Sequence, residues 1–206
     1  MKQINKYIQE RLHINKDIGN HYNYHPTTKD ELKELVDQLI EKRGNEANLN
    51  DIDTSEITDM FKLFCRSNFN GDISKWDVSN VKTMYSMFDN SSFTGKNSDI
   101  SNWDVSNVKD MRCMFYGTSF TGDISNWDVS NVEDMRYMFS KSKFNGDISQ
   151  WDVSNVYDMN SMFAHSSFTC ENGDISKWDV SKVKDMSYMF DESSLEKNPP
   201  KWYKKK

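Results

Sequence analysis

The chain of 206 residues has little cysteine, little proline and no long apolar run. Its three cysteines, Cys65, Cys113 and Cys170, fall at different places in the repeat described below, so they form neither a repeated disulfide nor a CxxC metal site. No stretch approaches the roughly 18 apolar residues of a membrane span, and the first twenty residues lack the apolar segment of a signal peptide. We therefore expect no membrane association and a cytoplasmic protein, or an extracellular one if a signal peptide has been removed.

Positive charge and catalytic motifs are also scarce. Lysine and arginine number 26 against 32 acidic residues, which gives a net charge of -6. Nucleic-acid phosphates require basic residues, so we expect no direct binding of DNA or RNA. The four histidines follow no pattern, and no HExxH, GxSxG, P-loop or GxGxxG motif is present. These absences predict a protein that is not an enzyme and has no catalytic residues, cofactor or metal site.

One motif dominates the sequence instead. D-I-S-x-W-D-V-S-x-V-x-x-M-x-x-M-F recurs with small changes, and its tryptophan places the copies at Trp76, Trp103, Trp127, Trp151 and Trp178, with a further tryptophan in register at Trp202. A fixed period of about 24 residues indicates stacked copies of one small unit. Two steps are longer because three extra residues enter the turns at 94–99 and 169–174.

The apolar period changes within each unit. Trp-Asp-Val-Ser alternates between apolar and polar residues, which predicts a short strand with its tryptophan and valine inward. In one copy a helical face of two turns follows, with the apolar residues Val132, Met135, Met138 and Phe139. Ser130, with Glu133 three residues later, forms a capping box at its start. The predicted fold class is an α/β solenoid of leucine-rich-repeat-like coils of about 24 residues, one short strand plus one short helix each, with Trp, Val, Met and Phe as its core.

The repeat divides the chain into three regions. We interpret 1–48 as an N-terminal helical cap and 203–206 as a basic tail. Between them, 49–202 forms the repeat solenoid, with one degenerate, five full and one half repeat. We expect the terminal copies to be atypical because they end the stack.

Two helical signals mark the cap. A short apolar stripe consists of Ile4, Tyr7, Ile8 and Leu12. Further on, Thr28 and Glu31 form a T-x-x-E capping box, and Gly44 follows the last apolar residue as a stop signal. This second pattern predicts an amphipathic helix of about 15 residues whose apolar face packs against the open end of the repeats.

The motif DISxWDVSNVxxMxxMF resembles the repeats of the family called mycoplasma protein of unknown function, also described as palindromic amphipathic (PARCEL) repeats. That family is grouped with the BspA-like leucine-rich-repeat surface proteins. The resemblance covers about 49–202. It implies a solenoid, a bacterial or phage-related source and a binding role, including adhesion in secreted members, and it supplies no functional residues.

The candidate site is the aspartate that follows each tryptophan. These residues are Asp77, Asp104, Asp128, Asp152 and Asp179, and the polar residues that precede the tryptophans are Lys75, Asn102, Asn126, Gln150 and Lys177. Both sets should face outward. Aspartates about 5 Å apart repel by roughly 0.8 kcal/mol in water and therefore need compensation. Each carboxylate could accept backbone N–H bonds at a turn, or the row could bind a basic partner, or cations could sit between coils.

A second aspartate row precedes Ile-Ser and predicts turn chemistry; it comprises Asp72, Asp99, Asp123, Asp147 and Asp174. The leading functional hypothesis is a monomeric, non-enzymatic repeat scaffold that mediates protein–protein interaction through an acidic, strand-lined face and binds a protein partner, for which a basic protein is one candidate. The alternatives are an acidic nucleic-acid mimic that inhibits a DNA- or RNA-binding protein, a bacterial surface adhesin or glycan binder, and a structural spacer.

Overall fold

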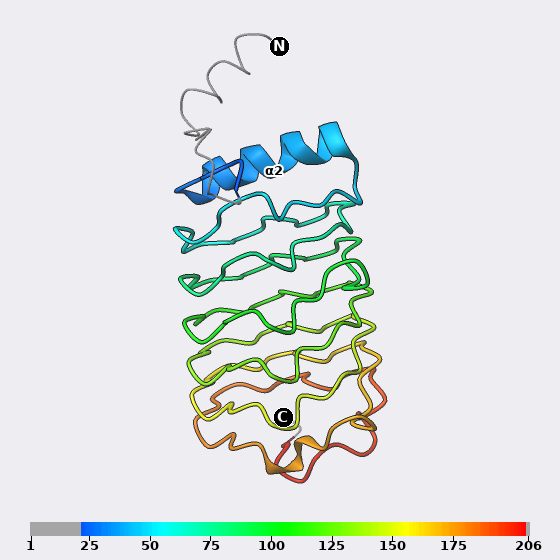
Figure 1. Ribbon diagram of the computed structural model, residues 1–206. Helices are drawn as coiled ribbons and strands as arrows, with labels where there is room; N and C mark the ends of the chain where they lie inside the picture. Colours follow the sequence, from blue (N-terminus) through cyan, green and yellow to red (C-terminus); the bar gives the residue numbers. More distant parts are fainter. Residues whose placement is uncertain (1–21, 205–206) are drawn as a thin grey trace.

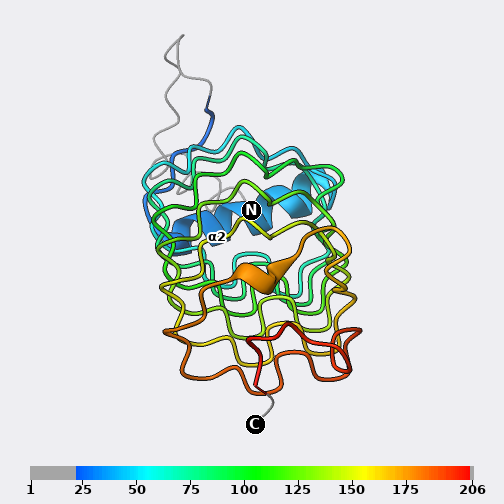
Figure 2. The same ribbon diagram turned by 90° about the horizontal axis from the view of Figure 1, so that it is seen from below.

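The computed structural model describes residues 22–204, which form a stack of irregular coils along one axis (Figure 1). Helix α2, Lys29–Arg43, lies across the N-terminal end of the stack (Figure 2). The other helical element among the described residues is a short 3-10 helix, η1, Ile175–Lys177. The predicted stripe from Ile4 to Leu12 and the last two residues of the basic tail lie outside the described residues.

The predicted amphipathic helix is confirmed as α2. The Thr28 side chain accepts the backbone N–H of Glu31 at 3.3 Å, and the Glu31 carboxylate accepts the N–H of Thr27 at 2.9 Å. Gly44, with φ of 88°, ends the helix. The apolar face is buried in one core with the coils through Leu32, Leu35, Val36 and Leu39. No helix in the described ranges is long and apolar enough to cross a membrane.

The inward Trp, Val, Met and Phe residues form the core, as predicted. Their phenylalanines make a column in which consecutive ring centroids lie 5.5 to 5.8 Å apart; it runs through Phe64, Phe88, Phe115, Phe139, Phe163 and Phe190. In five of these six coils a second phenylalanine stacks on the column, as Phe120 does on Phe115 at 4.2 Å, and in the coil of Phe190 its place is taken by Leu195. Burial of these rings stabilises coils that are too small to bury an apolar face alone.

The predicted α/β solenoid, with one short strand and one short helix in each unit, is wrong. Within 22–204 no strand forms, and the β-type pairing between neighbouring coils is limited to isolated single-residue parallel bridges such as Asp110↔Asp134. In the segment predicted as a strand, the Trp76 N–H bonds to the Ile73 carbonyl at 3.1 Å and the Val81 N–H to the Val78 carbonyl at 2.9 Å. The chain therefore turns where the alternation predicted an extended strand.

The predicted helix fails because two backbone positions in each coil are left-handed. Their φ values lie between 48° and 65°, and an α-helix needs negative φ. The first position precedes the second Met or Leu of the motif and comprises Lys62, Ser86, Cys113, Tyr137, Ser161 and Tyr188. The second lies two residues after the following phenylalanine and comprises Arg66, Asn90, Gly117, Lys141, His165 and Glu192.

Hydrogen bonds between coils take the place of helical bonds. In the segment that was predicted to be helical, every second backbone amide donates to a carbonyl of the next coil. In the coil of Trp76 these bonds are 2.7 to 3.0 Å long, and the donors Met84, Ser86, Phe88 and Asn90 bond to the carbonyls of Asp110, Arg112, Met114 and Tyr116. An intervening amide donates three residues back, as Met87 does to Met84 at 3.0 Å. We call this repeated set of bonds the amide ladder. It satisfies the backbone groups that a helix or sheet would otherwise pair.

The predicted capping box at Ser130 is also wrong. The Ser130 N–H donates to the Asp128 carboxylate at 3.0 Å, so this serine lies inside a turn and begins no helix. At the other end of the stack, the Trp202 indole N–H donates to the Ile175 carbonyl at 2.9 Å, and its ring stacks on Trp178 at 6.3 Å. The last half unit therefore covers part of the final coil.

Candidate acidic interface

The predicted aspartate row, Asp77, Asp104, Asp128, Asp152 and Asp179, is exposed in every coil, and so are the polar residues before the tryptophans. We call these five aspartates the outer row. In each of them Oδ1 accepts the backbone N–H of the serine two residues later, at 3.0 to 3.1 Å. In two copies the serine hydroxyl also donates, at 2.6 Å to Asp77 and to Asp104. The turn role considered from the sequence is therefore present.

These hydrogen bonds favour the charged form of three outer-row aspartates. Bonds from the side chain and backbone of Ser106 hold the pKa of Asp104 below its ordinary value. Ser154 and Ser181 lower the pKa of Asp152 and of Asp179 in the same way. A hydrogen bond to the ionised form favours that form, so these carboxylates are negative at neutral pH.

The second oxygen of each outer-row carboxylate is left open. Among residues 22–204 no donor bonds to Oδ2 of these five aspartates, and none of them forms an ion pair. Among the described preceding polar side chains, Gln150 alone makes a hydrogen bond, to its neighbour Ser149 at 3.1 Å. The outer row is thus a line of exposed carboxylates without an ion-pair partner among residues 22–204.

The second aspartate row shows the predicted turn chemistry. Its carboxylates accept the backbone N–H of the serine two residues later at 2.8 to 3.0 Å; the aspartates are Asp72, Asp99, Asp123, Asp147 and Asp174. All but Asp72, which also accepts from Asn48 at 3.0 Å, are exposed. Four coils therefore carry a second exposed carboxylate five residues before the outer-row aspartate, which the sequence analysis left out of the site.

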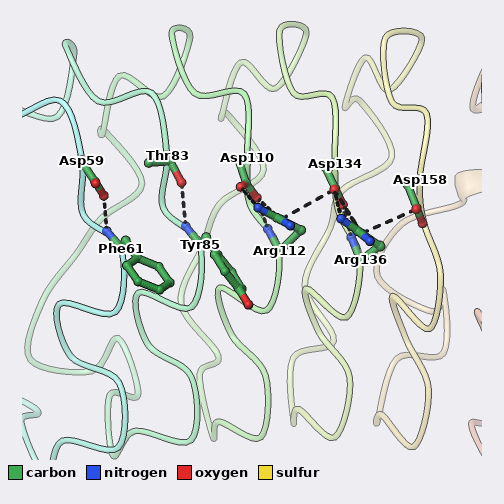
Figure 3. Close-up of polar contacts among 9 residues, drawn as sticks. All are labelled: Asp59, Phe61, Thr83, Tyr85, Asp110, Arg112, Asp134, Arg136 and Asp158. Carbon is green, nitrogen blue, oxygen red and sulfur yellow. Dashed lines mark hydrogen bonds and ion pairs between the residues drawn. The ribbon is translucent and has the colours of Figure 1, made fainter.

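A third row, which the sequence analysis missed, is neutralised by arginines in its middle part. It follows the single-residue bridges through Asp59, Thr83, Asp110, Asp134, Asp158 and Asp185. Figure 3 shows the part from Asp59 to Asp158. Arg112 bonds to Asp110 through Nε at 2.9 Å and reaches Asp134 in the next coil at 3.6 Å. Arg136 bonds to Asp134 at 2.6 Å and reaches Asp158 at 3.5 Å. We call this set the bridge row.

The bridge row is structural. Asp134 is only 3% exposed, and its charge is matched by an arginine of its own coil and one of the preceding coil. Arg112 also lies over the Tyr85 ring, with Cζ 4.4 Å from the centroid. The coil of Asp158 has Asn160 in place of an arginine, and burial raises the pKa of Asp158. The sequence signal was Asp-Met-Arg at 110–112 and 134–136. The ion pairs between an arginine of one coil and an aspartate of the next become evident only in the stacked structure.

One group of side chains among the described residues could hold a metal ion. The potential ligand atoms of His165, Asp191 and Glu192 lie within 4.8 Å of one another. His165 Nδ1 is 3.0 Å from Glu192 Oε2, and both of these side chains are exposed. An ordinary surface pair accounts for this geometry.

The cysteines are poor nucleophiles, and this gives a first prediction. All three are free and half-buried, and burial raises the pKa of each, that of Cys113 to about 11. Because the thiolate is the reactive form, we expect Cys113 in the folded protein to alkylate about a hundred times more slowly at pH 8 than in the unfolded chain. Iodoacetamide labelling followed by peptide mass spectrometry measures both rates. Equal rates would contradict a buried, protonated thiol.

Comparison with known proteins identifies a family. The family model described as "Mycoplasma protein of unknown function, DUF285" matches residues 31–143 and 117–206, most of the chain. This match bears out the first part of the resemblance seen in the sequence and does not extend to BspA-like surface proteins. No curated protein and no solved structure matches the chain.

Proposed function

For a chain that belongs to the family Mycoplasma protein of unknown function, we propose a non-enzymatic binding role. The stack of coils is a rigid scaffold, and its outer row binds a basic segment of a protein partner. The partner's lysines or arginines contact the open Oδ2 atoms of Asp77, Asp104, Asp128, Asp152 and Asp179. The polar residues before the tryptophans flank this contact.

The contrast between the outer row and the bridge row carries the proposal. Both rows repeat once per coil, and like charges at that spacing repel. The chain supplies Arg112 and Arg136 to the bridge row, whereas no described basic residue forms an ion pair with the outer row. A basic partner would supply the missing compensation and would be steered by the same charge.

The turn bonds favour binding as well as folding. Each Oδ1 is held by a serine amide, so the carboxylate already points in one direction before a partner arrives. A fixed carboxylate loses less conformational freedom on binding than a mobile one. The surface is built from turns, which replaces the strand-lined face expected from the sequence. Binding through exposed charge should weaken as salt rises.

Neutralising three outer-row carboxylates tests the proposal. We expect the triple variant Asp104→Asn, Asp128→Asn and Asp152→Asn to bind a labelled Lys/Arg-rich peptide at least about tenfold more weakly at low salt. Asparagine keeps the oxygen that accepts the serine N–H, so the turns should survive. Fluorescence anisotropy measures affinity, and circular dichroism checks the fold. Because the pKa of Asp104 and of Asp152 is lowered, wild-type binding should persist at pH 5.

A matched control separates a site from net charge. The triple variant Glu34→Gln, Glu41→Gln and Glu56→Gln removes the same number of charges from other exposed positions and should bind like wild type. Equal weakening by both triples would mean that overall acidity alone attracts the peptide. A loss confined to Asn substitutions at Asp99, Asp123 and Asp147 would move the site to the second row. A partner recovered with the wild-type protein from bacterial lysate should likewise be lost with the outer-row triple.

A further inference from the structure

The final coil leaves part of the amide ladder open. In the coil before it, Met159, Ser161 and Phe163 donate their N–H groups to the carbonyls of the following coil, at 2.8 to 2.9 Å. The equivalent amides of the final coil belong to Met186, Tyr188 and Phe190. Within the described part of the chain these three amides donate to no acceptor.

This edge presents amide donors without the alternating acceptors of an ordinary strand. The carbonyls of Asp185 and Ser187 point back and accept from Met159 and Ser161 of the preceding coil. An ordinary strand edge alternates donors and acceptors, so it can pair with a second copy of itself. Three donors in a row cannot pair with three donors. The partner of this edge must therefore supply oxygen atoms.

The C-terminal end is less acidic than the rest of the molecule. The described residues 180–204 contain five lysines and four acidic residues, in a chain with a net charge of -6. Lys184 and Lys204 line a depression of about 340 Å³ beside the open amides. Its apolar wall consists of Val180, Val183, Met186 and Trp202. The surroundings of the edge thus favour a negatively charged chain that also carries an apolar side chain.

The two ends of the stack differ in their cover. Helix α2 lies across the N-terminal end (Figure 1). At the other end, Trp202 stacks on Trp178 and Tyr203 contacts the edge of the Phe190 ring at 5.1 Å. This half unit leaves Val180, Val183 and Met186 only partly buried. The open amides and the depression therefore lie beside each other on the final coil.

We propose that the C-terminal edge, formed by the amides of Met186, Tyr188 and Phe190 with Lys184 and Lys204, binds an extended acidic segment of a partner protein. Carbonyl and carboxylate oxygens of that segment accept the three N–H groups. One apolar side chain of the segment enters the depression. The ligand proposed for this edge is acidic, whereas the ligand proposed for the outer row is basic. The two proposals can therefore be tested independently of each other.

Nuclear magnetic resonance tests this site at the level of single amides. The probe is a synthetic decapeptide of Asp and Glu with one central Leu, titrated into the ¹⁵N-labelled chain of 206 residues. We expect the amide resonances of Met186, Tyr188 and Phe190 to shift. Those of Met159 and Phe163, which are already bonded within the stack, should stay in place. A peptide in which Asn and Gln replace Asp and Glu should bind at least about tenfold more weakly.

Charge reversal provides the matched comparison. Lys184→Glu with Lys204→Glu should weaken binding of the acidic probe at least about tenfold, while Lys82→Glu with Lys143→Glu should change it by less than about twofold. Three results would overturn the proposal: no shifts at about 1 mM probe, equal binding of the uncharged peptide, or equal weakening by both pairs. Shifts of the same amides on raising protein concentration alone would assign the edge to a second copy instead.

Discussion

Replacing Phe115 by alanine is expected to destabilise the protein by about 3–5 kcal/mol. Phe115 is 0% exposed, and its ring lies 5.6 Å from that of Phe88 and 5.8 Å from that of Phe139. The substitution removes the ring from the middle of a continuous column and leaves a cavity that rigid neighbours cannot fill. Because each coil contacts only its neighbours, the loss should separate the two halves of the stack.

Chemical denaturation followed by tryptophan fluorescence measures this loss. Tyr188→Ala is the control, because Tyr188 is 65% exposed, and its effect should stay within about 0.5 kcal/mol. In the Phe115 variant, amide hydrogen exchange should be faster in the coils on both sides of the one that contains residues 111–120. A destabilisation below about 1 kcal/mol would show that the phenylalanine column is not the main support of the stack.

The core could be predicted from the sequence because it depends only on which positions recur. Trp127, Val129 and Phe139 occupy fixed places in a repeated unit, and side chains at such places stack whatever the backbone between them does. The helix α2 could also be predicted, since its signals at Thr28, Glu31 and Gly44 are local. Both inferences survive an error in the backbone conformation of the coils.

The conformation of each coil could not be predicted in this way. An apolar pattern at i, i+3, i+6 and i+7 is typical of a helix, and Met135, Met138 and Phe139 fit it. In the structure Tyr137 has φ of 57°, a conformation that costs a residue other than glycine about 1–2 kcal/mol. Bonds to the neighbouring coil offset that cost. Tyrosine, lysine and serine at these positions carry no local signal for a left-handed backbone.

The acidic rows show the same division. Sequence reasoning places Asp104 on the surface because Trp103 and Val105 beside it are buried. It could not distinguish this exposed row from the bridge row, since both have an aspartate at one fixed place in most units. The distinction depends on Arg112 reaching Asp134 across a coil boundary. Such a contact depends on how neighbouring coils are aligned in the stack, which the sequence of one unit does not show.

Proline in the amide ladder should separate the role of the backbone bonds from that of the side chains. The Met135 N–H donates to the Asp158 carbonyl at 3.0 Å, whereas the equivalent Met186 N–H has no acceptor among residues 22–204. We expect Met135→Pro to cost at least about 3 kcal/mol more than Met135→Ala, because proline removes the donor and its ring crowds the facing carbonyl. At Met186 the same difference should be below about 1 kcal/mol.

Comparing proline with alanine at each position cancels the lost methionine side chain, which is buried at position 135 and half-buried at 186. Comparing these two differences with each other cancels the restraint that proline places on the preceding aspartate, because the two sites are equivalent in the repeat. Urea unfolding of the four variants gives both differences. If they are equal, the strain of the proline ring accounts for the loss. If only Met135 is sensitive, one-directional bonds between coils hold the stack together, and the same bonds are open at its final coil.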